Sequence, residues 1–449
     1  MIGTGYVGLV SGTCFADIGH TVYCVDKDVS KIEKLNSGKS PIYEPGLDEL
    51  IKENYRAKRL FFTTNISDAL NKSDIIFICV GTPSKKNSLS VDLSYVLNAA
   101  KEISKFSKNK KIIITKSTVP VGTGDQIEKM LKNKKKFTVI SNPEFLREGD
   151  AIRDFRYPDR IVVGSNSKYA FKIIKNLYLP LINKGAKFFT TNRRGAELIK
   201  YASNAYLATK ITFINEIANL CEKTGINVED VSLGMGSDVR IGSRFLRAGP
   251  AYGGSCFPKD TKGLVSIGNK VKIDLSIVKS VIKSNENRKL LLLKNIELLI
   301  GKNIKNKRIV FLGVTFKPNT DDMRDAASLI MIPHLLKKKA IVSYYDPTGE
   351  KKDFNKLKNC YFYSNINKAC NNADLVILHT EWDEFKSLNF NQIVNNKKFI
   401  LYDLRNLYNL EEMRKKKIKY FSIGRTSFNW FQKLLQSQQQ HLVGVNWHL

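Results

Sequence analysis

A glycine-rich turn near the start of the sequence constrains the fold more than any other feature. Glycines follow the pattern Gly3-x-Gly5-x-x-Gly8, and an apolar run from Val22 ends at Asp26. In a strand-turn-helix unit, the first glycine makes the tight turn, the second admits a pyrophosphate, and the third lets the helix pack on the sheet. An acid about 20 residues further on accepts the ribose 2′-hydroxyl and repels a 2′-phosphate. The pattern predicts an NAD-binding unit; the alternative is a glycine-rich turn without a cofactor role.

The rest of the chain extends this unit into a larger α/β protein. Short apolar runs alternate with helical patterns, then helical periodicity continues from Gly195 to about Asn295, and the alternation resumes after Asn303. This order predicts an α/β fold with two Rossmann-like doubly wound domains joined by a long central helical connector. The expected strands are Thr21 to Asp26, Ile75 to Val80, Lys111 to Thr115, Thr138 to Ser141, Lys307 to Gly313, Ala340 to Tyr345, Leu375 to His379 and Phe399 to Asp403.

Both ends depart from this pattern. Only Met1 and Ile2 precede Gly3, although the strand that feeds such a turn is usually about five residues long. We expect the first strand to be missing or shortened: either the true start lies upstream, or the domain lacks a central strand and binds its cofactor weakly. The expected domains are 1–190 (NAD-binding), 195–297 (helical, dimerisation), 303–425 (second Rossmann-like domain) and 426–449 (a glutamine-rich appended tail).

Composition excludes several classes of protein. Many of the lysines behind the net charge of +31 stand in short runs without interleaved aromatics, which favours a solvated surface over a specific nucleic-acid site. No apolar run approaches the roughly 20 residues that cross a bilayer, and no secretion signal opens the chain, so we expect a cytoplasmic protein. The seven cysteines form no CxxC pair and the five histidines no cluster, so neither a disulfide framework nor a metal site is expected.

One cysteine has unusual neighbours, in the segment from Gly253 to Asp260. Two glycines before Cys256 would let a bulky substrate approach the backbone, and Pro258 suits a first helical position. A sulfur near a helix N-terminus favours the reactive thiolate. With the NAD-binding pattern, this predicts an oxidation through a covalent thiol adduct; the alternative is a small buried hydrophobe.

Three further segments carry candidate polar groups. Residues 116–120 and 142–148 each follow an expected strand, at the sheet edge where ligands bind. Glu144 and Glu148 could both face the cleft if a helix starts after Pro143, although a glutamate taken alone is more often a solvated charge. Lys200 and Asn204 share one face of the connector helix and could stabilise a developing oxyanion.

These residues resemble the UDP-glucose 6-dehydrogenases, within the UDP-glucose/GDP-mannose dehydrogenase family. The resemblance runs from Ile2 to about Arg425. The motifs that carry it are Gly3-Thr4-Gly5-Tyr6-Val7-Gly8, Pro41-Ile42-Tyr43-Glu44-Pro45-Gly46-Leu47, Gly81-Thr82-Pro83, Asn142-Pro143-Glu144-Phe145-Leu146 and Gly253-Gly254-Ser255-Cys256-Phe257-Pro258-Lys259-Asp260.

The resemblance implies a four-electron oxidation of a sugar C6 alcohol to a carboxylate, with two NAD molecules. Cys256 would hold the intermediate aldehyde as a thiohemiacetal, and a thioester would then be hydrolysed. The implied catalytic residues are Cys256, Lys200, Asn204, Asp260, Glu144 and Thr118. The implied NAD-binding residues are Gly3, Gly5, Tyr6, Val7, Gly8, Asp26, Lys31, Thr82, Thr118, Glu148, Lys259 and Arg324. The implied residues for UDP-glucose are Glu144, Phe145, Leu146, Glu148, Lys200, Asn204, Arg240, Tyr252, Gly253, Gly254, Lys317 and Arg405.

The family also implies a homodimer, in which the connector helix forms the interface and Arg240 reaches into the other subunit. Phe257 after the cysteine favours UDP-glucose, because GDP-mannose enzymes tend to carry leucine there. Three alternatives stay open: a dehydrogenase of another nucleotide sugar such as GDP-mannose, an inactive nucleotide-sugar-binding protein, and a nucleic-acid-binding protein.

Overall fold

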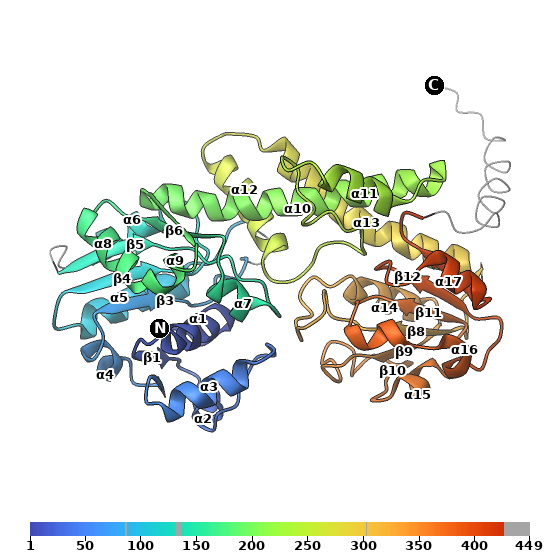
Figure 1. The fold of residues 1–449 in the computed structure, drawn as a ribbon, viewed down its shortest axis with the longest axis horizontal. Coiled ribbons are helices and arrows are strands. Elements are labelled where there is room, and N and C mark those ends of the chain that lie inside the picture. Colours follow the sequence, from blue (N-terminus) through green and yellow to red (C-terminus); the bar gives the residue numbers. More distant parts are fainter. Residues whose placement is uncertain (86–87, 132–135, 302, 426–449) are drawn as a thin grey trace. The chain divides into compact units, whose positions relative to one another are not determined.

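The structure, a computed structural model, describes residues 1–85, 88–131, 136–301 and 303–425 (Figure 1). The tail expected at 426–449 lies outside the described residues. Contacts divide the chain into two compact units, of which the first contains Met1–Ala205, Lys259–Val278 and Asn319–Asp321. The second contains Tyr206–Pro258, Lys279–Pro318 and the residues from Asp322 onward. The predicted α/β class, with two Rossmann-like sheets and a helical connector, is confirmed.

The first unit is built on a mostly parallel sheet. Its strands are β1 Val22–Val25, β2 Leu60–Thr63, β3 Ile75–Ile78, β4 Lys111–Thr115, β5 Phe137–Ser141, β6 Arg160–Gly164 and β7 Lys187–Thr191. Its helices are α1 Tyr6–Asp17, α2 Val29–Asn36, α3 Leu47–Arg56, α4 Ile66–Asn71, α5 Ser94–Phe106, α6 Thr123–Met130, α7 Ala151–Arg156, α8 Lys168–Leu177 and α9 Leu179–Ile182. The four strands expected in this half are present. The sheet departs from the expected parallel pattern at one pair, because β5 and β6 are antiparallel.

A single residue takes the central place of this sheet. Ile2 makes parallel bridges to Val25 on one side and to Ile78 on the other. Its N–H donates to the Phe77 carbonyl at 2.8 Å, and its carbonyl accepts from Cys79 N at 2.8 Å. The strand order is therefore β2-β1-Ile2-β3-β4-β5-β6-β7, which keeps the Rossmann arrangement around a one-residue strand.

The second unit contains a fully parallel sheet. Its strand order is β10-β9-β8-β11-β12-β13, the Rossmann order in which the first strand lies at the centre. The strands are β8 Arg308–Leu312, β9 Ile341–Tyr345, β10 Cys360–Phe362, β11 Leu375–Leu378, β12 Ile400–Asp403 and β13 Lys419–Ser422. The helices are α14 Ser328–Lys337, α15 Ile366–Cys370, α16 Phe390–Ile393 and α17 Leu410–Lys415, with a 3-10 turn, η1, at Asp383–Ser387.

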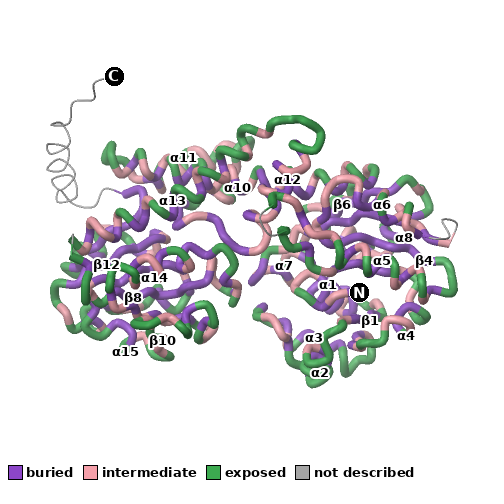
Figure 2. Tube along the Cα trace, turned by 180° about the vertical axis from the view of Figure 1, so that it is seen from behind, coloured by how far each residue is buried: buried purple, intermediate pink, exposed green. Residues whose placement is uncertain are grey.

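Apolar layers cover both faces of each sheet, and central strands such as β4 and β8 are largely buried, which Figure 2 shows in purple. In β4, Ile112 and Ile114 belong to one buried cluster while Ile113 belongs to another on the opposite face. In β11, Ile377 and Val376 divide in the same way. Because both faces of these strands are buried, they read as continuous apolar runs, which is why the sequence revealed them.

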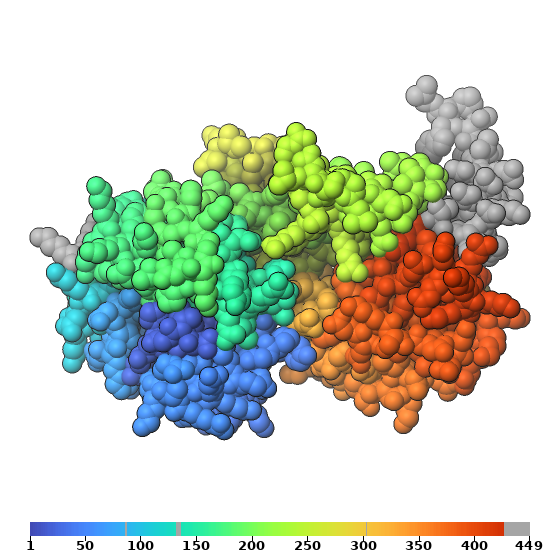
Figure 3. All heavy atoms as spheres, in the orientation of Figure 1, coloured from blue at the N-terminus to red at the C-terminus, as the bar shows by residue number. Residues whose placement is uncertain are grey.

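Four helices lie between the two sheets in the sequence. They are α10 Arg193–Thr224, α11 Val228–Gly236, α12 Phe257–Lys270 and α13 Ser276–Ile300. Within the second unit, α11 is attached to the end of β13, since Val228 N donates to the Gly424 carbonyl at 2.8 Å. The residues of α11 lie beside the C-terminal part of this unit in Figure 3. Among the described helices, none combines the length and apolarity needed to span a membrane.

Candidate active site

The glycine turn leads directly into α1, and its three glycines differ in what surrounds them. Gly3 has a φ of +96°, and a Cβ there would lie 2.8 Å from the Cys79 carbonyl oxygen. A Cβ on Gly8 would lie 1.9 Å from the Gly3 carbonyl oxygen, so α1 can approach the turn only through a glycine. A Cβ on Gly5 would meet nothing within 4 Å. Open space is therefore left at Gly5, where the pattern expects the pyrophosphate, beside the start of α1.

Asp26 ends β1 and closes this turn from the other side. Its Oδ2 accepts from Thr4 N at 2.9 Å and from Thr4 Oγ1 at 2.7 Å, and Oδ1 accepts from Asp28 N at 3.1 Å. Lys31 Nζ lies 3.8 Å from Oδ2. Burial pushes the pKa of Asp26 upward, but the hydrogen bonds from Thr4 and Asp28 and the Lys31 charge outweigh it and lower the pKa below 3.8. Asp26 is thus an ionised acceptor at neutral pH.

Two further candidates follow the neighbouring parallel strands β3 and β4, at the same edge of the sheet. Thr82 is buried in the segment after β3, and Thr118 is partly buried in the segment after β4. Ser117 joins the two segments, because its hydroxyl donates to the Val80 carbonyl at 2.7 Å. The edge that carries the glycine turn therefore also carries both threonines.

A buried ion pair joins the segment after β5 to α10. Lys200 Nζ lies 3.1 Å from Glu144 Oε1, and each side chain is 4% exposed. Glu144 Oε2 also accepts from Leu146 N at 2.6 Å. Two cations lie near the ring of Phe145, with the Arg160 guanidinium carbon 4.0 Å and Lys200 Nζ 5.1 Å from its centroid. Arg160 was not among the predicted residues.

A second buried polar pair lies one helical turn further along α10. Asn204 Nδ2 donates to Asp260 Oδ2 at 2.6 Å, and Lys259 Nζ donates to Asp260 Oδ1 at 2.5 Å. Asp260 is 1% exposed and lies in the first turn of α12. The first unit therefore brings Lys200 to Glu144 and Asn204 to Asp260, which are four of the six residues predicted to be catalytic.

The helix considered after Pro143 is not present. Residues 142–147 have no regular secondary structure, and the next helix, α7, starts at Ala151. Both glutamates are nevertheless buried, and Glu148 Oε2 accepts from Thr320 Oγ1 at 3.4 Å. Their shared burial comes from an irregular segment held by side chains, and not from the i,i+4 spacing of a helix.

In the second unit, Cys256 is partly buried and directly precedes α12. Its Sγ lies 3.5 Å from Ser255 Oγ. The structure gives a second reason for the two glycines before Cys256, and their approach to a substrate stays a prediction. A Cβ on Gly253 would lie 2.7 Å from the Asp325 carbonyl oxygen, and a Cβ on Gly254 would lie 2.7 Å from the Phe316 ring. The protein's own segment fills that space.

The predicted cations of the second unit differ widely in exposure. Arg405 is largely buried, donating to the carbonyls of His379 at 2.8 Å and Phe316 at 2.7 Å, and burial lowers its pKa. Lys317 is partly buried, with its ammonium 5.9 Å from the centroid of the Phe316 ring. Arg240 and Arg324 are held by nearby aspartates with 86% and 62% of their side chains exposed.

The comparisons with known proteins agree with this architecture. Residues 1–182, 194–287 and 310–410 match the NAD binding, central and UDP binding domains of the UDP-glucose/GDP-mannose dehydrogenase family. The chain belongs to this family. It is 48% identical to the UDP-glucose 6-dehydrogenase of Rhizobium meliloti, over 95% of this chain and 99% of that protein, and 47% identical to that of Rickettsia prowazekii, over 94% and 98%. A solved UDP-glucose dehydrogenase from Pyrobaculum islandicum is similar at a TM-score of 0.85 and 33% identity, covering 93% of this chain and 95% of that one.

The first unit of this dehydrogenase is suited to its NAD cofactor. The open space at Gly5 is where a pyrophosphate can approach backbone amides, and Asp26 is an ionised acceptor for ribose hydroxyls. NAD, when bound, supplies the acceptor for hydride. The carboxylate at Asp26 disfavours the 2′-phosphate of NADP.

The sequence did not reveal which side chains hold the backbone of the segment before Cys256 in this dehydrogenase. They are Asn215, Asn285 and Arg288, here called the clamp residues. Asn285 on α13 accepts from Tyr252 N at 2.9 Å and donates to the Tyr252 carbonyl at 3.1 Å. Asn215 on α10 accepts from Gly249 N at 2.8 Å, and Arg288 Nε donates to the Gly249 carbonyl at 3.2 Å. The only available signal was three polar residues at buried helix positions.

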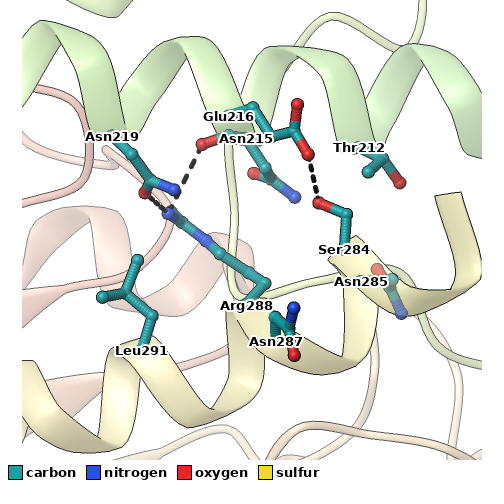
Figure 4. A pocket seen from close by; sticks show the side chains of 9 residues that line it. All are labelled: Thr212, Asn215, Glu216, Asn219, Ser284, Asn285, Asn287, Arg288 and Leu291. Carbon is teal, nitrogen blue, oxygen red and sulfur yellow. Dashed lines mark hydrogen bonds between the residues drawn. The ribbon is translucent and has the colours of Figure 1, made fainter. Parts of the chain in front are cut away.

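These clamp residues face a cavity of about 290 Å³ between α10 and α13 (Figure 4). The backbone in and near the segment that they hold is strained, because two non-glycine residues have positive φ angles, Ala251 at +134° and Phe245 at +67°. The cavity contains none of the predicted site residues and is lined by Thr212, Asn215, Glu216, Asn219, Ser284, Asn285, Asn287, Arg288 and Leu291.

Proposed function

We propose that this protein oxidises UDP-glucose to UDP-glucuronate. The observation that carries the proposal is the pair of buried contacts on successive turns of α10, Lys200 with Glu144 and Asn204 with Asp260. Asp260 lies in the first turn of the helix that begins directly after Cys256. A cation, an amide, two carboxylates and a thiol are the groups that a covalent oxidation of an alcohol to an acid requires.

The reaction converts one alcohol, two NAD and one water into a carboxylate, two NADH and three protons. In the first step the alcohol loses a proton and a hydride, and Lys200 and Asn204 stabilise the developing oxyanion. Cys256 then adds to the aldehyde as a thiolate, which gives a thiohemiacetal. Loss of a proton and of a second hydride leaves a thioester, which water hydrolyses to the carboxylate and a proton with release of the thiol. Glu144 and Thr118 assist proton transfer in hydrolysis, with Asp260 beside the reacting oxygen.

Binding residues are assigned in the same proposal. The diphosphate and uridine of the substrate contact Lys317, Arg405, Arg240 and the segment around Tyr252, since cations match a diphosphate. The sugar lies against residues 144–148. The NAD site includes Gly3 to Gly8, Asp26, Lys31, Thr82, Thr118, Glu148, Lys259 and Arg324. We assign residues 1–190, 195–297 and 303–425 to NAD binding, dimerisation and UDP-sugar binding.

We infer that the protein is a homodimer. Tyr206, Phe213 and Leu220 recur every seven residues on α10, which places them on one face, and they are 62%, 45% and 57% exposed. Contiguous exposed apolar side chains mark an interaction surface. The exposed Arg240 supports its assignment as a residue that reaches a second subunit. We also infer a cytoplasmic location, which is supported by seven free cysteines.

The function is tested by the NADH formed per mole of limiting UDP-glucose with excess NAD. A ratio near two is expected, because a four-electron oxidation passes two hydrides to NAD. Cys256→Ser is expected to abolish acid formation while NAD affinity stays within about twofold. Full turnover by this variant contradicts covalent catalysis. Turnover of GDP-mannose in preference to UDP-glucose identifies a different sugar, and NAD-independent binding of UDP-glucose without turnover identifies an inactive binding protein.

A further inference from the structure

The Pro41–Leu47 motif contains a buried carboxylate that the proposed reaction does not use. Glu44 is 7% exposed, and both of its oxygens accept hydrogen bonds from backbone amides. Oε2 accepts from Gly149 N at 2.5 Å, and Oε1 accepts from Ala151 N at 2.7 Å and more weakly from Ile152 N at 3.4 Å. One carboxylate therefore accepts hydrogen bonds from three backbone amides about a hundred residues further along the chain.

The backbone at Gly149 contacts residues from three other segments of the chain, namely Tyr6, Glu44 and Asn319. Its N–H is also 2.6 Å from the Tyr6 hydroxyl, which belongs to the first turn of α1. Gly149 has a φ of +83°, and a Cβ there would lie 2.5 Å from the Asn319 carbonyl oxygen. Tyr6 and Glu44 thus accept from the N–H of Gly149, and Asn319 can pack against Gly149 only because this residue has no side chain. These contacts fix the position of the backbone at Gly149.

The segment that Glu44 holds carries the candidate catalytic and binding glutamates. Residues 142–147 form neither helix nor strand, so few backbone hydrogen bonds of their own fix them. At the start of the segment, Asn142 is held by Tyr178, whose hydroxyl donates to Asn142 Oδ1 at 2.6 Å. At the other end, the amides of Gly149 and Ala151 depend on Glu44. Glu144 and Glu148 lie between these two attachment points.

We propose that Glu44 is a positioning residue that holds the backbone of residues 144–151 so that Glu144 meets Lys200. Through the Gly149 amide it also links this segment to Tyr6 at the glycine turn. The inference rests on the proposed function, because it assigns the motif a task in the same reaction. A displaced Glu144 would be less able to assist proton transfer, although Glu44 itself touches neither substrate nor cofactor.

The test compares Glu44→Gln with Glu49→Gln. Glutamine keeps the shape but can offer an acceptor oxygen to only one side, and its amide NH₂ would face backbone N–H groups. Glu49 is an exposed residue on α3, so its substitution makes the same charge change without touching the segment. Amide hydrogen exchange would be measured on peptides covering residues 145–152, together with kcat, the KM for UDP-glucose and the Kd for NAD.

In Glu44→Gln we expect faster exchange in residues 149–151 and a kcat lower by about 10- to 100-fold, as for other residues that orient a reacting group. The Kd for NAD should also rise, because Glu148 and Tyr6 belong to the proposed NAD site and contact the same segment, and Glu49→Gln should match the wild type. A purely structural role predicts a lower melting temperature with an unchanged kcat per folded molecule. That result, or unchanged exchange in residues 149–151, overturns the proposal.

Two further arms keep the test decisive. If Glu44→Gln does not fold, Glu44→Asp keeps the charge but reaches fewer amides, and it should show the same changes to a smaller degree. If neither variant folds, the amides of Gly149 and Ala151 must be protected in the wild type, and free exchange there overturns the proposal. If the wild type does not oxidise UDP-glucose, the proposed function fails while the exchange comparison still tests the positioning of this segment.

Discussion

The turn after Ile2 and the turn after β8 occupy the same place in the two sheets, yet only the first continues directly into a helix. Gly3 and Gly313 both have positive φ, at +96° and +70°. A side chain on Gly3 would meet Cys79 and one on Gly313 would meet Thr380, and each of these residues follows the neighbouring strand. The first glycine is therefore a requirement of the sheet in both units and does not by itself indicate a cofactor.

The residues after that glycine separate the two turns. The first turn has open space at Gly5, two residues after Gly3, and α1 begins at the next residue. The second turn has Thr315 two residues after Gly313, fully buried, and α14 begins only at Ser328. The pyrophosphate site thus depends on open space and on the adjacent helix start, both of which only the first turn has.

The acids that close the two turns differ in the same way. Asp346 accepts from Val314 N at 2.9 Å and from Thr315 N at 3.4 Å, as Asp26 accepts from Thr4. Asp346 is fully buried and lies 3.3 Å from the buried ammonium of Lys351. Asp26 keeps an exposed edge. The aspartate at this position is paired inside the second unit, as Asp346, whereas in the first unit it is accessible to a ligand, as Asp26.

The largest expected effect comes from Asp346→Ala. This substitution leaves the Lys351 ammonium, whose side chain is 5% exposed, without its partner. Removing one member of a buried ion pair costs about 3 to 5 kcal/mol. Urea unfolding should show this loss in the second unit, while NAD affinity stays at the wild-type value. A variant of wild-type stability would show that Asp346 is not an interior counter-ion.

Gly8→Ala should have the next largest effect. Its Cβ would lie 1.9 Å from the Gly3 carbonyl oxygen, so α1 must move away from the turn. Overpacking of this kind costs about 1 to 3 kcal/mol, and NAD binding should weaken with it. Gly5→Ala is the matched control: its melting temperature should be unchanged, while its affinity for NAD should fall because the methyl group occupies the open space. Equal melting temperatures for the two variants would contradict the assigned roles.

A smaller effect is expected from pH, because His379 in the second unit and Asp26 in the first unit affect the free energy of unfolding over different pH ranges. Burial, helped by the Arg405 charge, lowers the pKa of His379 from 6.5 to about 3. Between these values the unfolded chain binds a proton that the folded protein does not, so stability falls by about 1.4 kcal/mol per pH unit below pH 6.5. Asp26 acts in the other window, because its lowered pKa removes stability only below pH 3.8. Unfolding curves at pH 7 and pH 5 should therefore differ less in His379→Gln than in the wild type, and equal pH dependence would exclude His379 as the source.

The smallest effect is expected for Lys31→Met. Its ammonium lies 3.8 Å from Asp26 and its side chain is 39% exposed, so the pair should contribute below about 1 kcal/mol. NAD titration should detect a change of less than about fivefold, with no change in melting temperature. A larger loss would mean that Lys31 contributes more to NAD binding than a partly exposed ion pair does.

Most of the strands that the sequence predicted are buried on both faces. Lys111–Thr115 and Leu375–Leu378 are such strands, and both were found. The strand β7, Lys187–Thr191, was missed because three of its five residues are polar and its only apolar residues are Phe188 and Phe189. The strands β2, β6, β10 and β13 were missed as well. Of these, β10 is only three residues long, whereas β6 and β13 are mostly buried and their short apolar runs were overlooked.

The sequence predicted the site less completely. Motif residues such as Lys200 and Asn204 could be found because helical spacing puts them on one face. Glu44 and Asn285 could not be assigned a task, because their partners are backbone amides and carbonyls far along the chain. The glycines before Cys256 were predicted to admit a substrate, and the sequence could not reveal that Phe316 and Asp325 also leave no room for side chains there.

The contact between Phe316 and Gly254 makes the cysteine segment a reporter of events elsewhere in its unit. Arg405 holds the Phe316 carbonyl, and the Phe316 ring lies against the backbone two residues before Cys256. A ligand or a substitution that shifts Arg405 must therefore alter the packing around the thiol. The rate at which a small alkylating reagent labels Cys256 would give an optical or mass-based signal of nucleotide occupancy, without any turnover.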